Sequence, residues 1–229
     1  MTTLTGKRND WNKMLSVVSG YTKEAKIEVN DGKATILAVD PAHVAIIKAN
    51  IECGGDAEPF TINVEQCLKA LNAAGGDDVV FDFGNEGNLM IIGNARVKMP
   101  LEADLGEIRD INRSMFDEIS ASGKIDPASI EPCVSYGTWN KEDVVSIVVA
   151  DNRFKVCVGQ DRHTAEVYGE GEGEATSKYP LDYFETMIKQ AKGSEVSIKI
   201  PYTNYPMLAE WSSGSGEFSL VIAPRIEQE

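Results

Sequence analysis

The 229-residue sequence lacks the segments that would place a protein in a membrane or at a metal centre. No apolar run approaches the roughly 20 residues that a membrane-spanning helix needs, and the first residues lack the apolar stretch of a secretory signal. Histidine is scarce, because only His43 and His163 occur, and neither has a cysteine or carboxylate spaced to share a metal ion. We therefore expect no membrane, no metal and no cofactor among the partners of the chain.

Cysteine is also sparse and shows no ligand-like spacing. The four cysteines form no Cys-x-x-Cys pair and fall inside periodic apolar runs: Cys53, Cys67, Cys133 and Cys157. This pattern is typical of reduced core residues in an intracellular protein and not of a disulfide framework or a zinc site. A cytoplasmic protein is the expectation, or a nuclear one in a eukaryote.

Patterns of catalytic residues are missing as well. The stretch 169–174 reads Gly-Glu-Gly-Glu-Gly-Glu, which alternates with anions and lacks the lysine of a phosphate-binding loop. We predict that it forms a mobile acidic turn. Asp77 and Asp78 are interpreted as a turn pair instead of a general acid and base. The sequence therefore predicts no catalytic residue and no enzyme.

Positive charge is in the minority. The chain has 22 Lys and Arg against 36 Asp and Glu, which gives a formal net charge of −14. Spread evenly, this charge would disfavour nucleic acid, because contacts to phosphate need cations. A protein that is acidic outside can still present basic side chains on one inner face, so the distribution of charge decides the question.

Two stretches of the chain, 64–83 and 181–200, repeat one pattern. Each begins with apolar residues at helical spacing, stops at a glycine (Gly76 and Gly193) and continues with a strand of period two. The length of the chain allows two domains of about 100 to 120 residues. The repeat therefore predicts two similar domains, at 1–101 and 125–229, joined by a connecting segment at 102–124.

Two further helices complete the pattern. The first is predicted to be capped by Asn9 or Asp10, and the third by Asp126, with Pro127 at its first position. Pro132 should kink or shorten the third helix. Strands are expected at 25–29, 34–39, 44–51, 79–83, 89–92, 95–101, 144–149, 154–158, 165–168, 196–200, 207–211 and 218–222. Each half thus has two helices packed on antiparallel sheets, which is an α+β fold.

Two short motifs resemble one family in particular. The segment 39–46, Val-Asp-Pro-Ala-His-Val-Ala-Ile, resembles the Met-Asp-x-x-His-Val segment of DNA sliding clamps of the proliferating cell nuclear antigen (PCNA) type. The tail 220–227, Leu-Val-Ile-Ala-Pro-Arg-Ile-Glu, is similar to the end of that family. Both helix–glycine–strand repeats also match, so the resemblance covers about 10–227, and archaeal members look nearest in length and style.

The resemblance implies a non-enzymatic processivity factor for DNA replication and repair. Three copies would close head to tail into a homotrimeric ring with the DNA-clamp fold, encircling duplex DNA without sequence specificity. The ring would tether DNA polymerase, the clamp loader, ligase and flap nuclease through short peptide motifs. The alternatives are one subunit of a heterotrimeric clamp, or a clamp-fold adaptor that binds proteins and not DNA.

Lysines on small polar helix faces would line the hole of such a ring. The residues assigned to DNA contact are Lys13, Lys69, Lys189, Lys192 and Lys23. Family positions that are often basic are polar here at Asn12, Ser19 and Asn72, and the third helix carries no basic residue. Lys7 and Arg8 would compensate if the N-terminus faced the hole. The alternative is that all of these are ordinary solvated side chains.

An apolar pocket that binds client peptides is the second site that the resemblance implies. The matching positions are Val39, His43, Val44, Ile46, Leu105, Ile108, Pro206, Val221, Ala223, Pro224 and Ile226. The alternative for each apolar residue among them is plain core. The partner peptide would lie under the connecting segment.

Subunit contact in the family pairs the strand before the connecting segment with an edge strand of the next protomer. Here these strands are 95–101 and 164–170. Edge pairing satisfies backbone hydrogen bonds, and closure of the ring removes the exposed edges. The residues assigned to this contact are Arg96, Lys98, Glu166 and Tyr168, with Glu170 as a second acid for charge pairing.

Overall fold

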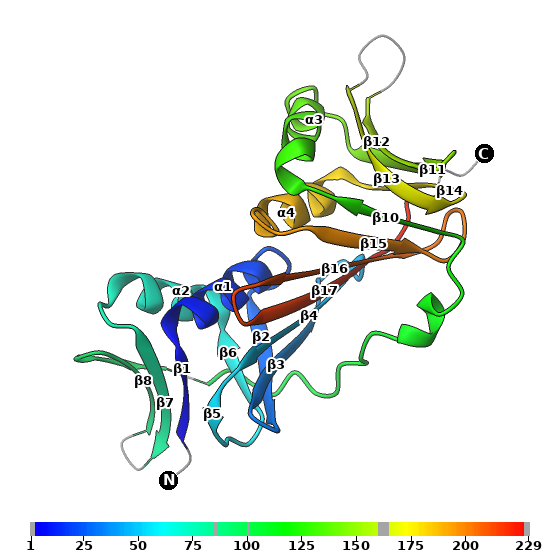
Figure 1. Cartoon of the computed structure of the whole chain (residues 1–229). Coiled ribbons are helices and arrows are strands. Elements are labelled where there is room, and N and C mark those ends of the chain that lie inside the picture. The colour runs from blue at the N-terminus through cyan, green and yellow to red at the C-terminus, as the bar shows by residue number, and fades with distance from the viewer. Residues whose placement is uncertain (1–2, 85–86, 100, 160–164, 227–229) are drawn as a thin grey trace. The chain divides into compact units, whose positions relative to one another are not determined.

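The computed structural model describes residues 3–84, 87–99, 101–159 and 165–226. The chain divides into two compact units (Figure 1). The first comprises Met1–Asp110 and Ser213–Phe218, and the second comprises Ile111–Ser212 and Ser219–Glu229. None of the described helices is long and apolar enough to cross a membrane. The predicted domain boundaries at residues 101 and 125 stay a prediction.

The first unit combines two helices with nine strands along the described chain. They are β1 Thr3–Lys7, α1 Arg8–Ser19, β2 Glu24–Asn30, β3 Lys33–Val39, β4 Ala45–Glu52, β5 Gly54–Gly55, β6 Phe60–Asn63, α2 Val64–Ala73, β7 Asp78–Gly84, β8 Gly87–Ile92 and β9 Ala95–Lys98. One sheet has the order β5-β1-β7-β8-β9, and β4-β3-β2-β6 run side by side in another. The strand pairings of the described residues in this unit are antiparallel, as the alternation of apolar residues predicts.

The second unit repeats this plan. Its elements are the 3₁₀ turn η1 Arg113–Phe116, β10 Ala121–Ile125, α3 Pro127–Trp139, β11 Val144–Ala150, β12 Arg153–Val158, β13 Ala165–Gly173, β14 Ala175–Pro180, α4 Leu181–Gln190, β15 Val196–Ile200 and β16 Met207–Ser213. Its strands follow the order β14-β11-β12-β13-β10-β15-β16. The last strand, β17 Gly216–Ile222, contributes residues to both units. The α+β fold with two similar halves is confirmed.

Each helix buries one face, as the spacing of its apolar residues predicts. Helix α1 buries Trp11, which packs against Phe81 with ring centroids 4.6 Å apart. Helix α4 buries Phe184 and Met187 in the same way. Within each unit the two helices contact each other, α1 with α2 and α3 with α4 (Figure 1).

The N-terminal segment forms a strand that is absent from the strands predicted from the sequence. It forms β1, which pairs with β7 and buries Leu4, and α1 begins directly after it at Arg8. The N-cap is Lys7, whose side chain makes no capping hydrogen bond, so the predicted cap at Asn9 or Asp10 is wrong. The direct junction leaves no non-helical residue at 9 or 10 for that role.

The acidic glycine stretch is not a turn, which corrects the prediction for residues 169–174. Strand β13 continues to Gly173 and pairs with β10, Gly123 opposite Gly171. Phe154 explains the glycines: a Cβ on Gly123 would lie 2.1 Å from its ring, and one on Gly171 would lie 2.9 Å from its backbone nitrogen. The glutamates are exposed and the glycines between them occupy the crowded face of the strand. The Gly-Glu repeat is therefore the two-residue alternation of a β-strand.

Helix α3 also differs from its prediction in one respect. The cap is confirmed, because the Asp126 carboxylate accepts a hydrogen bond from the Ala128 amide at 3.1 Å. The helix nevertheless runs through Pro132 to Trp139, so the predicted shortening is wrong. Pro132 is exposed, where water can reach the carbonyl that it leaves without a helical donor.

The cysteines are all free, as predicted. Cys67 and Cys133 are buried, and burial raises the pKa of each thiol, to about 12 and about 11 respectively. Cys53 and Cys157 are only half-buried, so the prediction of a core position is wrong for these two. Cys157 occupies a position on the less buried face of β12, and Cys53 lies between β4 and β5 outside any strand.

Candidate functional sites

The exposed sides of the paired helices are small and polar, as the sequence predicts. In the first unit, Asn12 of α1 donates from Nδ2 to Oδ1 of Asn72 of α2 at 2.6 Å. Ser16 donates to Oδ1 of Asn12 at 3.3 Å, which continues the polar contact along α1. These bonds join the helices without placing a charge between them, so any positive charge of this surface comes from its lysines.

Three of the predicted DNA-contact lysines form ion pairs within the chain. Lys69 lies 2.7 Å from Glu65, and Lys189 lies 3.0 Å from Glu185, both one helical turn apart. Lys192 reaches from the end of α4 to Glu131 of α3 at 2.8 Å. These lysines are exposed, and exposed pairs contribute only about 0.2–1 kcal/mol, so a phosphate can compete for them.

The two remaining lysines assigned to DNA occupy different surroundings. Lys13 of α1 is half-buried, and desolvation lowers the pKa of its ammonium. Lys23 is exposed beyond α1, and its carbonyl accepts the amide of Val64 at 2.9 Å, which fixes the start of α2. The placement of the five lysines on or beside the helices agrees with the sequence, and their contact with DNA stays a prediction.

Lys7 and Arg8 have structural partners instead of forming a further basic patch. Lys7 lies 2.7 Å from Asp78, and this bond raises the pKa of the lysine. The Arg8 guanidinium donates to the carbonyls of Leu71 and Ala74 at the end of α2. A cation at a helix C-terminus satisfies otherwise unpaired carbonyls and interacts well with the helix dipole.

Asp40 organises the first family-like motif. Its buried carboxylate accepts three backbone amides, from Ala42 at 2.9 Å, Val44 at 2.6 Å and Ala45 at 2.5 Å. His43, between them, takes a left-handed backbone with φ 57°. This role of Asp40 was not among the predictions, although an aspartate followed by proline is a known signal for such a loop.

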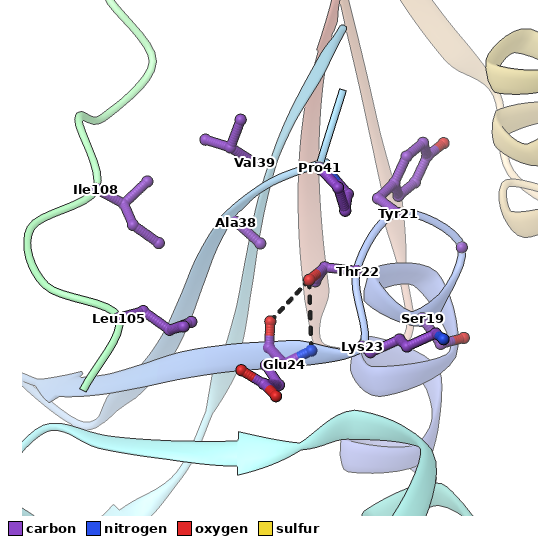
Figure 2. A pocket seen from close by; sticks show the side chains of 11 residues that line it. Ser19, Tyr21, Thr22, Lys23, Glu24, Ala38, Val39, Pro41, Leu105 and Ile108 are labelled. Atoms are coloured by element: carbon purple, nitrogen blue, oxygen red, sulfur yellow. Dashed lines mark hydrogen bonds between the residues drawn. The ribbon is translucent and has the colours of Figure 1, made fainter. Parts of the chain in front are cut away.

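A cavity of about 640 Å³ opens beside this loop (Figure 2). Three of its wall residues, Val39, Leu105 and Ile108, are predicted peptide-pocket residues. The remaining wall comes from Ser19–Glu24, Ala38 and Pro41. Figure 2 shows Leu105 and Ile108 of the connecting segment on one side of the cavity and Thr22 and Tyr21 on the other. The structure therefore brings these three predicted residues together around one open apolar space.

The connecting segment is held beside this cavity by two lysines, Lys26 and Lys48, that were not among the predicted site residues. Lys26 of β2 lies 3.0 Å from Asp104 and donates to the carbonyl of Gly106 at 3.2 Å. Lys48 of β4 lies 2.5 Å from Asp110. The bond from Lys26 lowers the pKa of Asp104. Two ion pairs thus hold residues 104–110 against the sheet that carries Val39.

The other predicted pocket residues do not line this cavity. His43 is exposed, while Val44 and Ile46 are half-buried. Further members belong to the second unit: Pro206, Val221, Ala223, Pro224 and Ile226. None of the predicted pocket residues is fully buried, so the alternative that they are plain core is wrong. Their assembly into one peptide site stays a prediction.

The tail of the second unit is anchored close to its end. The Arg225 amide donates to the carbonyl of Lys178 on β14 at 2.8 Å. Its guanidinium lies 2.6 Å from Asp143, just after α3. These bonds fix the course of 223–225, whereas Ile226 is 71% exposed and available to a partner.

The two strands predicted to join subunits both present open edges in the described part of the chain. Strand β9 ends its sheet and pairs only with β8. Strand β13 pairs with β12 over 165–170, but with β10 only over 170–173, so its first half has one free side. Pro100 and Thr164, within the predicted ranges, lie outside the described residues.

Charge along these edges is unevenly arranged. Arg96 and Lys98 are exposed on β9. Glu166 of β13 is held by Lys155 at 2.5 Å and by the Tyr168 hydroxyl, which donates to it at 2.7 Å. The Lys155 bond lowers the pKa of Glu166. Glu166 is thus already paired within its own chain, and its predicted contact with β9 must compete with Lys155.

No group of three or more histidine, cysteine or acidic residues suited to a metal ion occurs among the described residues. His163, the second histidine, lies outside them. Asp77 precedes β7, as predicted for a turn, but Asp78 is the first residue of β7 and is bound to Lys7, so the predicted turn pair is wrong for Asp78.

Comparison with known proteins agrees with this architecture. No family model matches the chain. A protein named DNA polymerase sliding clamp from Methanothermobacter thermautotrophicus is 23% identical over 93% of this chain and 92% of its own length. The protein of that name from Methanothrix thermoacetophila is 26% identical, covering 94% of both.

Solved structures match over 98–100% of the chain. PCNA of A. fulgidus, solved with the C-terminal region of FEN-1, superposes with a TM-score of 0.85 at 19% identity and covers all of both chains. PCNA of Thermococcus kodakaraensis gives 0.81 at 18% identity, covering 98% of this chain and 100% of that one. The PCNA2–PCNA3 complex of Sulfolobus tokodaii gives 0.80 at 16%, with the same coverage. The chain has the PCNA clamp fold throughout and resembles, along nearly its full length, the archaeal proteins named DNA polymerase sliding clamp.

Proposed function

We propose that the chain is the subunit of a DNA sliding clamp, a processivity factor that encircles duplex DNA and performs no catalysis. The observation that carries this proposal is the similarity to archaeal sliding clamps over more than nine-tenths of both chains, together with the clamp fold. The helix surfaces support it, since small polar side chains and lysines attract phosphate without reading base edges. The protein would work in the cytoplasm, at the nucleoid of an archaeal cell, or in the nucleus of a eukaryotic one.

Three copies would close the ring through their open strand edges. The β9 edge of one copy would pair with the first half of β13 in the next, which satisfies backbone groups that each isolated edge leaves open. Arg96 and Lys98 would then approach Glu170, and Glu166 where Lys155 releases it. A heterotrimer is the second candidate, because a clamp complex of two different chains is among the structural neighbours.

Client proteins would bind through short peptides at the cavity beside Val39. A. fulgidus PCNA binds the C-terminal region of FEN-1, which shows that this fold accepts such a segment. The half-exposed apolar walls, Val39, Leu105 and Ile108, would receive the apolar residues of the peptide. DNA polymerase, clamp loader, ligase and flap nuclease are the clients proposed.

An adaptor that does not bind DNA is the remaining candidate. The ion pairs of Lys69, Lys189 and Lys192, with the absence of basic residues on α3, favour it. These pairs leave the helix surfaces close to neutral. They weaken the electrostatic attraction of DNA, but a closed ring stays on DNA by topology and does not need tight contact.

Retention on circular DNA tests the proposal. The purified protein, with a clamp loader of an archaeon named above, is loaded on a nicked circular plasmid and separated by gel filtration. A sliding clamp elutes with the circle and is lost when one restriction cut linearises it. Native mass spectrometry of the free protein gives the number of subunits. A trimer lost from linear DNA supports the clamp, and a monomer found on neither form would refute it.

A further inference from the structure

Trp139 is an exposed tryptophan at the end of α3. Its side chain is 80% exposed, whereas the other two tryptophans, Trp11 and Trp211, are 0% and 4% exposed. Leaving such a large aromatic group in water forgoes the free energy that its burial would release. Folding of the second unit therefore does not explain why a tryptophan occupies position 139.

The surface around Trp139 is small and polar, and beyond the helix Lys141 is followed by Glu142 and by Asp143, which pairs with Arg225. Exposed residues of α3 on the way to it include Ser129, Ser135 and Thr138, and Trp139 is the only large apolar side chain of α3 that is exposed. Beyond it, Asn140 donates from Nδ2 to the carbonyl of Tyr136 at 2.9 Å and ends the helix. Lys141 follows, exposed and with a left-handed φ of 62°.

The surroundings of Trp139 distinguish between two kinds of binding partner. A peptide helix needs a broad apolar groove, and the exposed face of α3 offers one aromatic plane among hydroxyls. A single aromatic plane with a nearby cation is the pattern that binds single-stranded nucleic acid, where a base stacks and the phosphate meets positive charge. The observations therefore favour an unpaired base.

We propose that Trp139 stacks on an unpaired base of the template strand where duplex DNA ends within the ring, with Lys141 beside the adjoining phosphate. This inference rests on the proposed function, because α3 and its partner α4 belong to the helix layer that would face DNA. Bases inside a duplex are already stacked on their neighbours, and unstacking them costs a few kcal/mol. The contact is therefore selective for a primer–template junction over continuous duplex.

Intrinsic fluorescence gives a direct test, since Trp139 is the exposed tryptophan and the other two are shielded from collisional contact. The protein is titrated with a short duplex that carries an unpaired oligothymidine 5′ extension, and with a fully paired duplex of the same length. Stacking on a base quenches tryptophan emission. We expect quenching with the extended duplex, little with the paired one, and none with the variant Trp139→Phe.

Affinity provides the second readout, through the anisotropy of dye-labelled DNA. Trp139→Ala should weaken binding of the extended duplex roughly 5- to 100-fold, the loss typical of one stacked base, and leave the paired duplex unchanged. Trp139→Phe should retain part of the preference. Tyr202→Ala is the matched control, because Tyr202 is 51% exposed in the same unit and lies outside the helices.

The outcomes separate this inference from the proposed function. A protein that stays on nicked circles but shows equal affinity for both duplexes, before and after Trp139→Ala, overturns the stacking inference alone. A protein that is retained on no circle overturns the proposed function. Quenching by the FEN-1 peptide together with indifference to DNA would show that Trp139 serves protein binding, and it also overturns the inference.

Discussion

Replacing Asp40 should unfold the loop that forms one wall of the proposed peptide cavity. The carboxylate accepts the amides of Val44 and Ala45 at Oδ1 and that of Ala42 at Oδ2. In Asp40→Ala all three lose their acceptor, and only the Ala45 amide is fully buried, where water cannot replace it. A buried unpaired donor costs about 1–3 kcal/mol, so with two partly exposed bonds the loss of unfolding free energy should be about 2–4 kcal/mol.

Asp40→Asn separates hydrogen bonding from shape. Its Oδ1 retains the two bonds to Val44 and Ala45, and only the Ala42 amide meets a donor in place of an acceptor. A loss of about 1 kcal/mol is expected. Asp56→Ala is the control, since it removes a single bond to its neighbouring amide at a loop surface and should cost under about 0.5 kcal/mol.

Urea unfolding followed by circular dichroism measures these differences, and calorimetric titration with the FEN-1 C-terminal peptide of A. fulgidus measures binding. Peptide affinity should fall roughly tenfold in Asp40→Ala under conditions where the protein remains folded. If Asp40→Ala matched Asp40→Asn in both stability and affinity, the three bonds would not organise the loop. The assignment of the cavity wall to this loop would then be refuted.

Three further substitutions test the packing, the ring and the helix surface. Gly123→Ala should lower the free energy of unfolding in urea by about 2–4 kcal/mol, because the added Cβ meets an aromatic ring at 2.1 Å. Gly75→Ala should not lower it, because a Cβ there meets nothing within 4 Å, and equal effects of the two substitutions would contradict the packing argument. Lys98→Glu places an acid on the β9 edge and should shift native mass from trimer towards monomer; an unchanged trimer would exclude charge pairing there. Glu65→Gln releases Lys69, so duplex affinity should rise and its logarithmic salt slope should steepen by up to about 2.7 for three subunits; an unchanged slope would exclude Lys69 from phosphate contact.

Much of this fold could be predicted from local patterns, because each pattern involves only a few consecutive residues. The alternation along β3 and the helical spacing in α4 are such patterns, and both elements begin within one residue of their predicted starts. The Gly-Glu stretch of β13 has the same period of two. The sequence alone predicts a turn there because glycine usually marks one, whereas the atoms that crowd Gly171, the Phe154 nitrogen and a Val149 methyl at 2.9 Å each, lie on other strands, β12 and β11.

The contacts of the candidate sites differ in the same way: those within one element could be predicted from the sequence, and those between distant elements could not. The pairs Glu65–Lys69 and Glu185–Lys189 are separated by one helical turn and could be predicted from spacing. Lys192 meets a glutamate 61 positions away, and Arg8 meets carbonyls of another helix, so only the folded chain shows that these cations are engaged. A count of lysines therefore overstates the positive charge that the helix surface offers to DNA.

That near-neutral surface suits a ring better than a conventional DNA-binding protein. A protein held by affinity needs many phosphate contacts, and its binding then falls steeply with salt. In the proposed ring, persistence comes from closure, so retention on circular DNA should follow the strength of the β9–β13 contact and not the number of free lysines. Acids outside and paired charges inside would keep the ring from binding DNA by its outer face while leaving it mobile along the duplex. An adaptor with the same charges would gain nothing from circular DNA, which is why the topology of the DNA, and not its affinity, separates these functions.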